Sequence, residues 1–247
     1  MILVFDVSGS MAAEDIEPTR MEAAKTVAME FVKDQPSSVR IGVVAFSDGG
    51  LSVQSPDTNR EGTLATIERL VPRRGTSLGN GMLVALNTIA VDAGDPPIIS
   101  TSDRSTADDP LPAPQGWYPS AVIVLFSDGE NNQNPDPLVV TDLAIDLGVR
   151  IYTIGVGSEE GITIKVEGMN VHTRLDESLL TQIAETSGGR YYFAGDENEL
   201  RKIYNNLEPT LSIRPEDLEL TSILAGIGIL VFLLGGALSL LWFGRVI

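Results

Sequence analysis

Apolar runs alternate along the chain with stretches in which apolar residues recur at every third or fourth position. The runs at residues 1–5, 39–46, 121–126 and 149–156 are typical of strands that are buried on both faces. Strands separated by helices predict an α/β fold, with a doubly wound, mostly parallel sheet and helices on both faces. The other patterns predict helices at 19–34, 60–71, 78–91, 137–147, 178–186 and 197–207, a short antiparallel strand at 51–54, a hairpin at 162–175 and a strand at 190–193.

These elements belong to one predicted domain, residues 1–207, which contains a long surface insertion at 92–120. The insertion has six prolines and five aspartates and no periodic apolar pattern. Its two aromatic residues, Trp117 and Tyr118, are expected to pack the insertion against the body of the domain. The alternative is that they form a knob that binds a partner.

The domain is followed by a charged connector at 208–219, an apolar segment at 220–244 and a tail at 245–247. Residues 222–243 include no charged residue, and about 20 helical residues are enough to cross a hydrocarbon core of about 30 Å. Trp242 lies near one end, where interfacial aromatic residues are common. We expect a single transmembrane helix here. A buried core helix is the alternative, but such helices are rarely apolar on every face.

The beginning of the chain lies inside the first predicted strand. No charged segment, apolar segment or cleavage site typical of a signal peptide is present, so we expect that a preceding segment is missing. Lys and Arg do not set the orientation of the predicted span, because Arg214 precedes it and Arg245 follows it.

Composition narrows the classes of partner. The net charge is −17 over 247 residues, and the chain has no basic run. A nucleic-acid partner is not expected, because neutralising phosphates needs clustered Lys and Arg. The absence of cysteine excludes disulfides, thiolate zinc sites and cysteine nucleophiles. The acidic residues are expected to form a solvated surface, with an acidic docking patch as the alternative.

Candidate chemistry begins where the first strand ends. Asp6, Ser8 and Ser10 place one carboxylate and two hydroxyls within five residues. Ligation by oxygen alone is what a hard divalent cation such as Mg²⁺ prefers. The alternative interpretation is that these side chains cap the first helix. In either case, a helix starting after Ser10 would point its N-terminal N–H groups toward this region.

Two further residues are expected at the same place. In a doubly wound sheet, ligands bind at the carboxyl ends of the strands, where the strand order reverses. That position lies between the strand ending at Asp6 and the strand ending near Asp128, and the loop carrying Thr76 reaches the same end. Two carboxylates and three hydroxyls quench a divalent charge only in part. The sequence therefore predicts a metal site with one open coordination position.

Three motifs together carry a family resemblance. DVSGSM at 6–11, GTSLGNG at 75–81 and FSDGENN at 126–132, in this order, resemble a von Willebrand factor type A domain with an intact metal-ion-dependent adhesion site. The resemblance implies that the two motif serines and the loop threonine contact the ion through hydroxyls. It also implies that the two aspartates bind directly or through water.

A narrower resemblance covers other parts of the chain. AAEDIEPTRMEAAK at 12–25, VRIYTIGVG at 149–157, RLDESLLTQIAETSGGRYY at 174–192 and the terminal apolar segment are similar to bacterial Bat-type (aerotolerance) membrane proteins. That resemblance implies that the domain faces away from the cytoplasm. The Bat-type plan also includes a span before the domain, which we expect to belong to the missing preceding segment.

The sequence therefore predicts a membrane-anchored binding module. Its Mg²⁺, Mn²⁺ or Ca²⁺ would capture an Asp or Glu side chain of a protein partner, such as another subunit of a membrane complex. We expect no enzymatic activity and no small-molecule substrate. The only histidine, His172, falls in the predicted hairpin, and no general base or nucleophile elbow is visible. The alternatives are a structural scaffold whose metal stabilises loops and a metal-dependent hydrolase.

Overall fold

The computed structural model describes residues 1–48, 50–73, 75–98, 116–166, 169–194 and 235. The chain divides into two compact units, Met1–Thr210 and Leu211–Ile247. All of the helices and strands named below belong to the first unit.

A six-stranded sheet with the strand order β3-β2-β1-β4-β5-β8 forms the centre of this unit. Each neighbouring pair is parallel except β2–β3, which is antiparallel. The predicted α/β fold with a doubly wound, mostly parallel sheet is therefore confirmed. The strands are β1 (Ile2–Asp6), β2 (Ile41–Phe46), β3 (Gly50–Asp57), β4 (Val122–Ser127), β5 (Arg150–Gly155) and β8 (Tyr191–Phe193).

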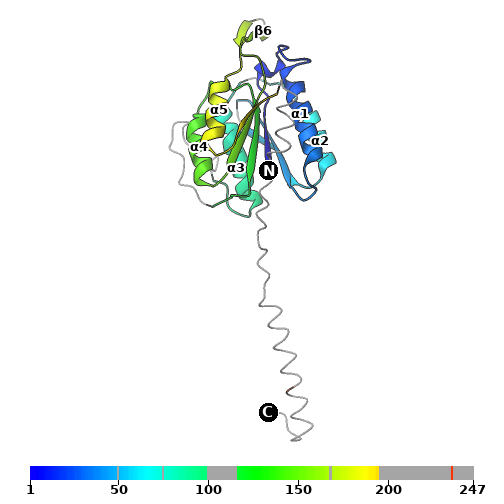
Figure 1. Ribbon diagram of the computed structural model, residues 1–247, viewed down its shortest axis with the longest axis vertical. Coiled ribbons are helices and arrows are strands. Elements are labelled where there is room, and N and C mark those ends of the chain that lie inside the picture. Colours follow the sequence, from blue (N-terminus) through cyan, green and yellow to red (C-terminus); the bar gives the residue numbers. More distant parts are fainter. Residues whose placement is uncertain (49, 74, 99–115, 167–168, 195–234, 236–247) are drawn as a thin grey trace. The chain divides into compact units, whose positions relative to one another are not determined.

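Helices cover both faces of the sheet (Figure 1). One face packs against α1 and α2, and the other packs against α3, α4 and α5. The apolar run of β1 follows from this arrangement. Leu3 and Phe5 enter the core on the α1 side, whereas Ile2 and Val4 enter the core on the α3 side. The helices are α1 (Arg20–Asp34), α2 (Arg60–Glu68), α3 (Leu78–Asp92), α4 (Pro137–Asp146) and α5 (Glu177–Thr186).

The start of α1 shows how local sequence sets an element boundary. The Thr19 hydroxyl accepts a hydrogen bond from the Glu22 N–H at 3.2 Å, which caps the helix. Met21, Ala24 and Phe31 then recur on the buried face, as the helical period predicts.

The helix predicted at 19–34 is confirmed as α1, but the segment directly after Ser10 is not α-helical. A short 3₁₀ helix, η1 (Gly9–Ala12), follows the motif, and α1 begins only at Arg20. Pro18 explains the delay, because a proline disfavours the helical conformation of the residue before it. Since Thr19 caps α1, the alternative that the motif side chains cap the first helix is wrong.

Two other boundaries differ from the sequence prediction. β3 is longer than the predicted strand at 51–54, and it shifts register where it pairs with β2. α2 ends at Glu68 rather than at Val71, whose helical conformation is disfavoured by the proline that follows it. Leu70 nevertheless remains buried against the core.

The predicted hairpin is present as β6 (Ile162–Val166) and β7 (Met169–Thr173), which pair antiparallel in a sheet of their own. In Figure 1 β6 projects from the end of the domain that is opposite to the N-terminus. His172 is exposed on this hairpin, as expected.

The end of the insertion is fixed to the domain by Tyr118, which is buried and donates a hydrogen bond from its hydroxyl to Asp95 Oδ2 at 2.7 Å. Trp117 remains 63% exposed, although a Cβ at Gly148 would lie 3.0 Å from its ring. The expected packing against the domain is thus confirmed for Tyr118, whereas Trp117 remains mostly exposed to solvent.

Several predictions fall outside the described residues. They concern most of the insertion (99–115), the helix at 197–207, the connector at 208–219, and the span at 220–244 apart from residue 235. Within the part of the chain that the structure describes, no helix has both the length and the apolar character needed to cross a membrane.

Candidate metal centre

Asp6 and Asp128 lie at the carboxyl ends of two neighbouring strands. Asp6 ends β1, and Asp128 follows β4, which pairs with β1 in parallel. The rings of Phe5 and Phe126, one residue before Asp6 and two residues before Asp128, stack with centroids 4.7 Å apart. The two carboxylates therefore stand side by side above a rigid apolar layer, at the predicted point where the strand order reverses.

The Asp6 carboxylate is fully buried and hydrogen-bonded at both oxygens. Its Oδ1 accepts the backbone N–H of Ser8 at 2.8 Å, and its Oδ2 accepts the hydroxyl of Ser127 at 2.7 Å. A buried carboxylate needs such partners, because desolvation of an unpaired charge costs several kcal/mol. These contacts fix the orientation of the Asp6 side chain.

The two motif serines lie beside this carboxylate. Their hydroxyl oxygens are 2.8 Å apart, and Ser8 is buried. The Ser10 hydroxyl also interacts with the Asp128 carboxylate and acts to lower its pKa. Side-chain contacts therefore place Asp6, Ser8, Ser10 and Asp128 together at this end of the sheet.

Thr76 is placed at the same end of the sheet through its backbone. Its carbonyl accepts the N–H of Asn132 at 3.5 Å, and the next residue, Ser77, donates its N–H to the Ser47 carbonyl at 2.6 Å. The Thr76 side chain is buried, but within the described residues no hydrogen bond joins its hydroxyl to the two aspartates or the two serines.

Burial raises the affinity of the Asp6 and Asp128 carboxylates for protons. Burial raises the pKa of Asp6, and the neighbouring Asp128 raises it further. Burial also raises the pKa of Asp128, against the opposing effects of Ser10 and Arg20. A divalent cation would reverse this balance by favouring both charged forms. The donor set, two buried carboxylates with hydroxyl oxygens beside them, therefore fits such an ion.

A group of three acidic or histidine side chains that could hold a metal is absent from the described residues. Such a group is absent because only two of the candidate ligands, Asp6 and Asp128, are acidic, and the remaining candidate ligands are hydroxyls. With two carboxylates supplied, a six-coordinate ion would keep positions for water or for a partner's oxygen.

Arg20 is a residue of the site that sequence reasoning missed. Its side chain is fully buried, and its Nη1 donates to Asp128 Oδ2 at 2.8 Å. Its Nε and Nη2 form a two-pronged contact with Asp15 at 2.8 and 2.7 Å. The available signal was its position in the first turn of α1, where a cation opposes the helix dipole and so needs another partner.

Arg20 and Asp15 connect the site to two segments from later in the sequence, which contain Ser158 and Thr173. Arg20 Nη1 also donates to the Thr173 hydroxyl at 2.9 Å, at the end of β7. Asp15 Oδ2 accepts both the N–H and the hydroxyl of Ser158, at 2.8 and 3.0 Å. Although burial alone would raise it, hydrogen bonds from Arg20 and Ser158 hold the pKa of Asp15 at about 2.

The turn after Asp128 depends on a glycine. Gly129 has a φ of 79°, which residues with a Cβ rarely adopt. A Cβ here would also lie 2.6 Å from the Asp176 carbonyl oxygen. The close approach allows the Asp176 N–H to donate to the Asp128 carbonyl at 2.7 Å, which joins the site to the start of α5.

Residues 1–130 match the model of the von Willebrand factor type A domain. The chain is 32% identical over 219 residues to a UPF0353 protein of Mycobacterium bovis (strain BCG / Pasteur 1173P2), with 84% of this chain covered. The match spans 59% of that relative's length.

Two solved structures share the fold. An aerotolerance-related membrane protein from Bacteroides fragilis has a TM-score of 0.64 at 21% identity, covering 83% of this chain and 96% of that chain. Proximal thread matrix protein 1 from the mussel byssus, with a zinc-occupied MIDAS motif, has a TM-score of 0.54 at 20% identity, covering 83% and 46%. The sequence match and the shared fold lead to one conclusion: this chain belongs to the von Willebrand factor type A domain family.

Proposed function

We propose that this chain is a binding module that takes up a divalent cation and uses it to hold an acidic side chain of a partner protein. The observation that carries the proposal is the buried pair of Asp6 and Asp128 beside the Ser8 and Ser10 hydroxyls, in which burial raises the pKa of both carboxyl groups. Its relation to the family supports the same assignment, as does the zinc-occupied motif of the mussel protein.

Each proposed ligand has its own part. Asp6 and Asp128 would supply the negative charge, and Ser8, Ser10 and Thr76 would supply neutral hydroxyl oxygens. A bound Mg²⁺, Mn²⁺ or Ca²⁺ supplies Lewis acidity toward a carboxylate oxygen at an open position. The hydrogen bonds to Asp6 from Ser8 and Ser127 hold that ligand in place before any ion arrives.

The charge on Asp128 is already shared with Arg20. One of its oxygens is engaged by the guanidinium, and the other accepts the Glu130 N–H at 3.1 Å. The net charge offered to an ion is therefore low. A low charge leaves the ion electrophilic, which favours an additional anionic ligand from outside.

We also propose that the module is membrane-anchored and faces away from the cytoplasm. The charge-free sequence at 222–243 supports an anchor, and one structural neighbour is described as a membrane protein. The proposed partners are then other subunits of a membrane complex, and neither nucleic acid nor a small-molecule substrate is proposed. We propose no enzymatic activity, because the two carboxylates of the described site, Asp6 and Asp128, are both assigned to the ion.

The test uses the full chain in detergent micelles. Mg²⁺ binding is measured by calorimetry, and partner capture from a membrane extract is measured with Mg²⁺ or with EDTA. Asp6→Ala or Thr76→Ala should abolish Mg²⁺-dependent capture while the far-UV circular dichroism is retained. Asp142→Ala, an exposed aspartate on α4, is the matched control and should behave like the wild type. Capture that EDTA does not change would contradict the proposal.

The same experiment separates the scaffold alternative. A metal that only stabilises loops would raise the melting temperature of the chain by mass action without any effect on capture. Mg²⁺-dependent stability without Mg²⁺-dependent capture would therefore favour the scaffold.

A further inference from the structure

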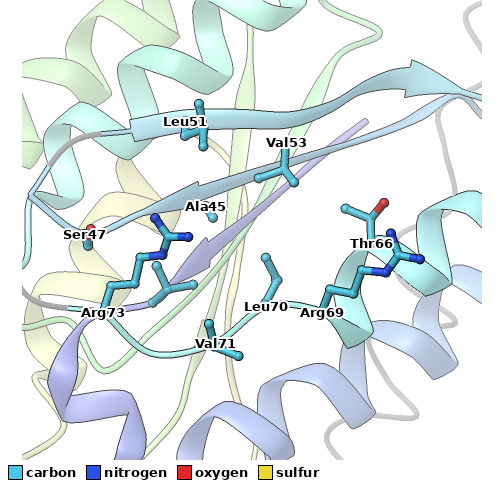
Figure 2. Close-up of a pocket in the computed structure, with 10 residues that line it drawn as sticks. Ala45, Ser47, Leu51, Val53, Thr66, Arg69, Leu70, Val71 and Arg73 are labelled. Atoms are coloured by element: carbon cyan, nitrogen blue, oxygen red, sulfur yellow. The ribbon is translucent and has the colours of Figure 1, made fainter.

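A groove of about 190 Å³ lies between β3 and the segment that joins α2 to α3, on the α1 side of the sheet (Figure 2). Three large apolar side chains line it and remain exposed to solvent: Leu51 at 61%, Val53 at 43% and Val71 at 57%. Only four other large apolar side chains are exposed within the described residues. Gathering of exposed apolar side chains at one place is typical of a binding surface.

Two cations flank these apolar side chains. Arg69 and Arg73 extend from the same segment into the groove (Figure 2). Both are exposed, and neither forms an ion pair with any other described residue. Two guanidiniums beside exposed apolar side chains give the groove a local positive charge in a chain with a net charge of −17.

The groove adjoins the candidate metal centre. Val7 lines the groove and is the residue between Asp6 and Ser8. The N–H of Arg73 donates to the Val7 carbonyl, so the groove wall is attached to the motif. The segment that carries Arg73 continues to Thr76, another proposed ligand. A partner segment lying in the groove would therefore run toward the metal.

We propose that the groove binds an extended segment of the partner protein in which acidic residues alternate with apolar ones. The apolar residues would cover Leu51, Val53 and Val71, and the acidic ones would pair with Arg69 and Arg73. The assignment of this segment to the same partner rests on the proposed function, in which an acid from that partner reaches the metal. A second copy of this chain fits less well, because two strongly acidic chains repel each other.

The test uses fluorescein-labelled peptides of about ten residues, an extended length that spans a few side-chain pockets. One peptide alternates Asp with Leu, a second alternates Lys with Leu, and a third alternates Asp with Ser. Binding to the full chain in detergent micelles is followed by fluorescence anisotropy in EDTA, so that no metal takes part. The Asp–Leu peptide should bind at least about tenfold more tightly than the other two.

Variants locate the binding. Replacing both arginines (Arg69→Gln with Arg73→Gln) should weaken binding of the Asp–Leu peptide about tenfold, and Leu51→Ser should weaken it similarly. Val139→Ser removes an apolar side chain of 50% exposure on α4 and is the matched control. Equal binding of the Lys–Leu peptide, or no effect of the groove variants, would overturn the proposal.

Two further outcomes are decisive. If an unlabelled peptide of residues 208–219 displaces the probe more strongly than the Asp–Leu peptide itself, the groove belongs to the chain's own connector and the partner assignment is overturned. Addition of Mg²⁺ separates the two proposals. If the groove variants weaken binding of the Asp–Leu peptide in EDTA, but neither Mg²⁺ nor Asp6→Ala changes that binding, the groove is supported and the metal function is contradicted. If Mg²⁺ strengthens binding, Asp6→Ala removes this gain and the groove variants have no effect, the metal function is supported and the groove is contradicted.

Discussion

Arg20 and Asp128 form an ion pair of 2.8 Å in which neither side chain is exposed to solvent. The pair joins the first turn of α1 to the end of β4, across 108 residues of sequence. It therefore ties one proposed metal ligand to the packing of the whole domain, and its removal has predictable consequences.

Replacement of Arg20 should destabilise the fold strongly. Arg20→Gln leaves Asp128 and Asp15 without their cation, and breaking a buried pair in this way costs about 3–5 kcal/mol. Arg20→Lys keeps the charge but loses the fork that contacts Asp15, so its loss should be smaller. Urea denaturation in EDTA measures both, with the exposed Arg190→Gln as control. Equal stability of Arg20→Gln and the control would refute the structural role of the pair.

Asp15 should contribute a definite part of the acid sensitivity. Its pKa in the folded chain is about 2, below its ordinary value of 3.8. Its stabilising effect is therefore present above about pH 4 and is lost as the pH falls toward 2. The difference in unfolding free energy between the wild type and Asp15→Asn should shrink over that range. A difference that stays constant from pH 5 to about pH 2 would contradict the assignment.

Mg²⁺ affinity should rise with pH. Because burial raises the pKa of both Asp6 and Asp128, and the charge of Asp128 raises that of Asp6 further, protons compete with the ion for both carboxylates. The apparent affinity should increase from about pH 5 to about pH 8, whereas two carboxylates of ordinary pKa would already be ionised over that interval. Calorimetric titration at several pH values measures the slope, and a flat profile would be evidence against the raised pKa values.

Gly129→Ala should disturb the turn that carries Asp128. The substitution combines a φ of 79° with a Cβ placed 2.6 Å from a backbone oxygen. Gly188→Ala is a close control, since Gly188 has a φ of 76° but nothing within 4 Å of its Cβ position. Both variants carry the cost of the backbone conformation, about 1 kcal/mol or more. The extra loss in Gly129→Ala isolates the contact with Asp176. Equal losses would show that the contact relaxes freely.

The positions of Asp6 and Asp128 followed from the sequence because parallel strands end at the same edge of a sheet. Both strands were recognisable as apolar runs, and the carboxylates follow them directly. Arg20 was not predictable in the same way. Its hydrogen-bond acceptors are Asp15, Asp128 and Thr173, which are far apart in sequence and meet only in the folded chain.

Local geometry was harder to predict than topology. The helical period predicted α1 at 19–34, but it gave no signal of the short 3₁₀ helix at Gly9–Ala12 that follows the motif. The exposure of Leu51 and Val53 depends on how far α2 covers the sheet, which no pattern within β3 determines. The groove was therefore visible only in the folded chain.

The central claim is that oxygen donors from three separate segments bind one divalent cation. Calorimetric titration of Mg²⁺ into the full chain, the Asp128→Asn variant and the Asp142→Asn control tests it most directly. The account predicts saturable binding of one ion to the wild type and the control and a loss of at least about tenfold in affinity for Asp128→Asn. No measurable binding to the wild type, or equal binding to all three proteins, would contradict it.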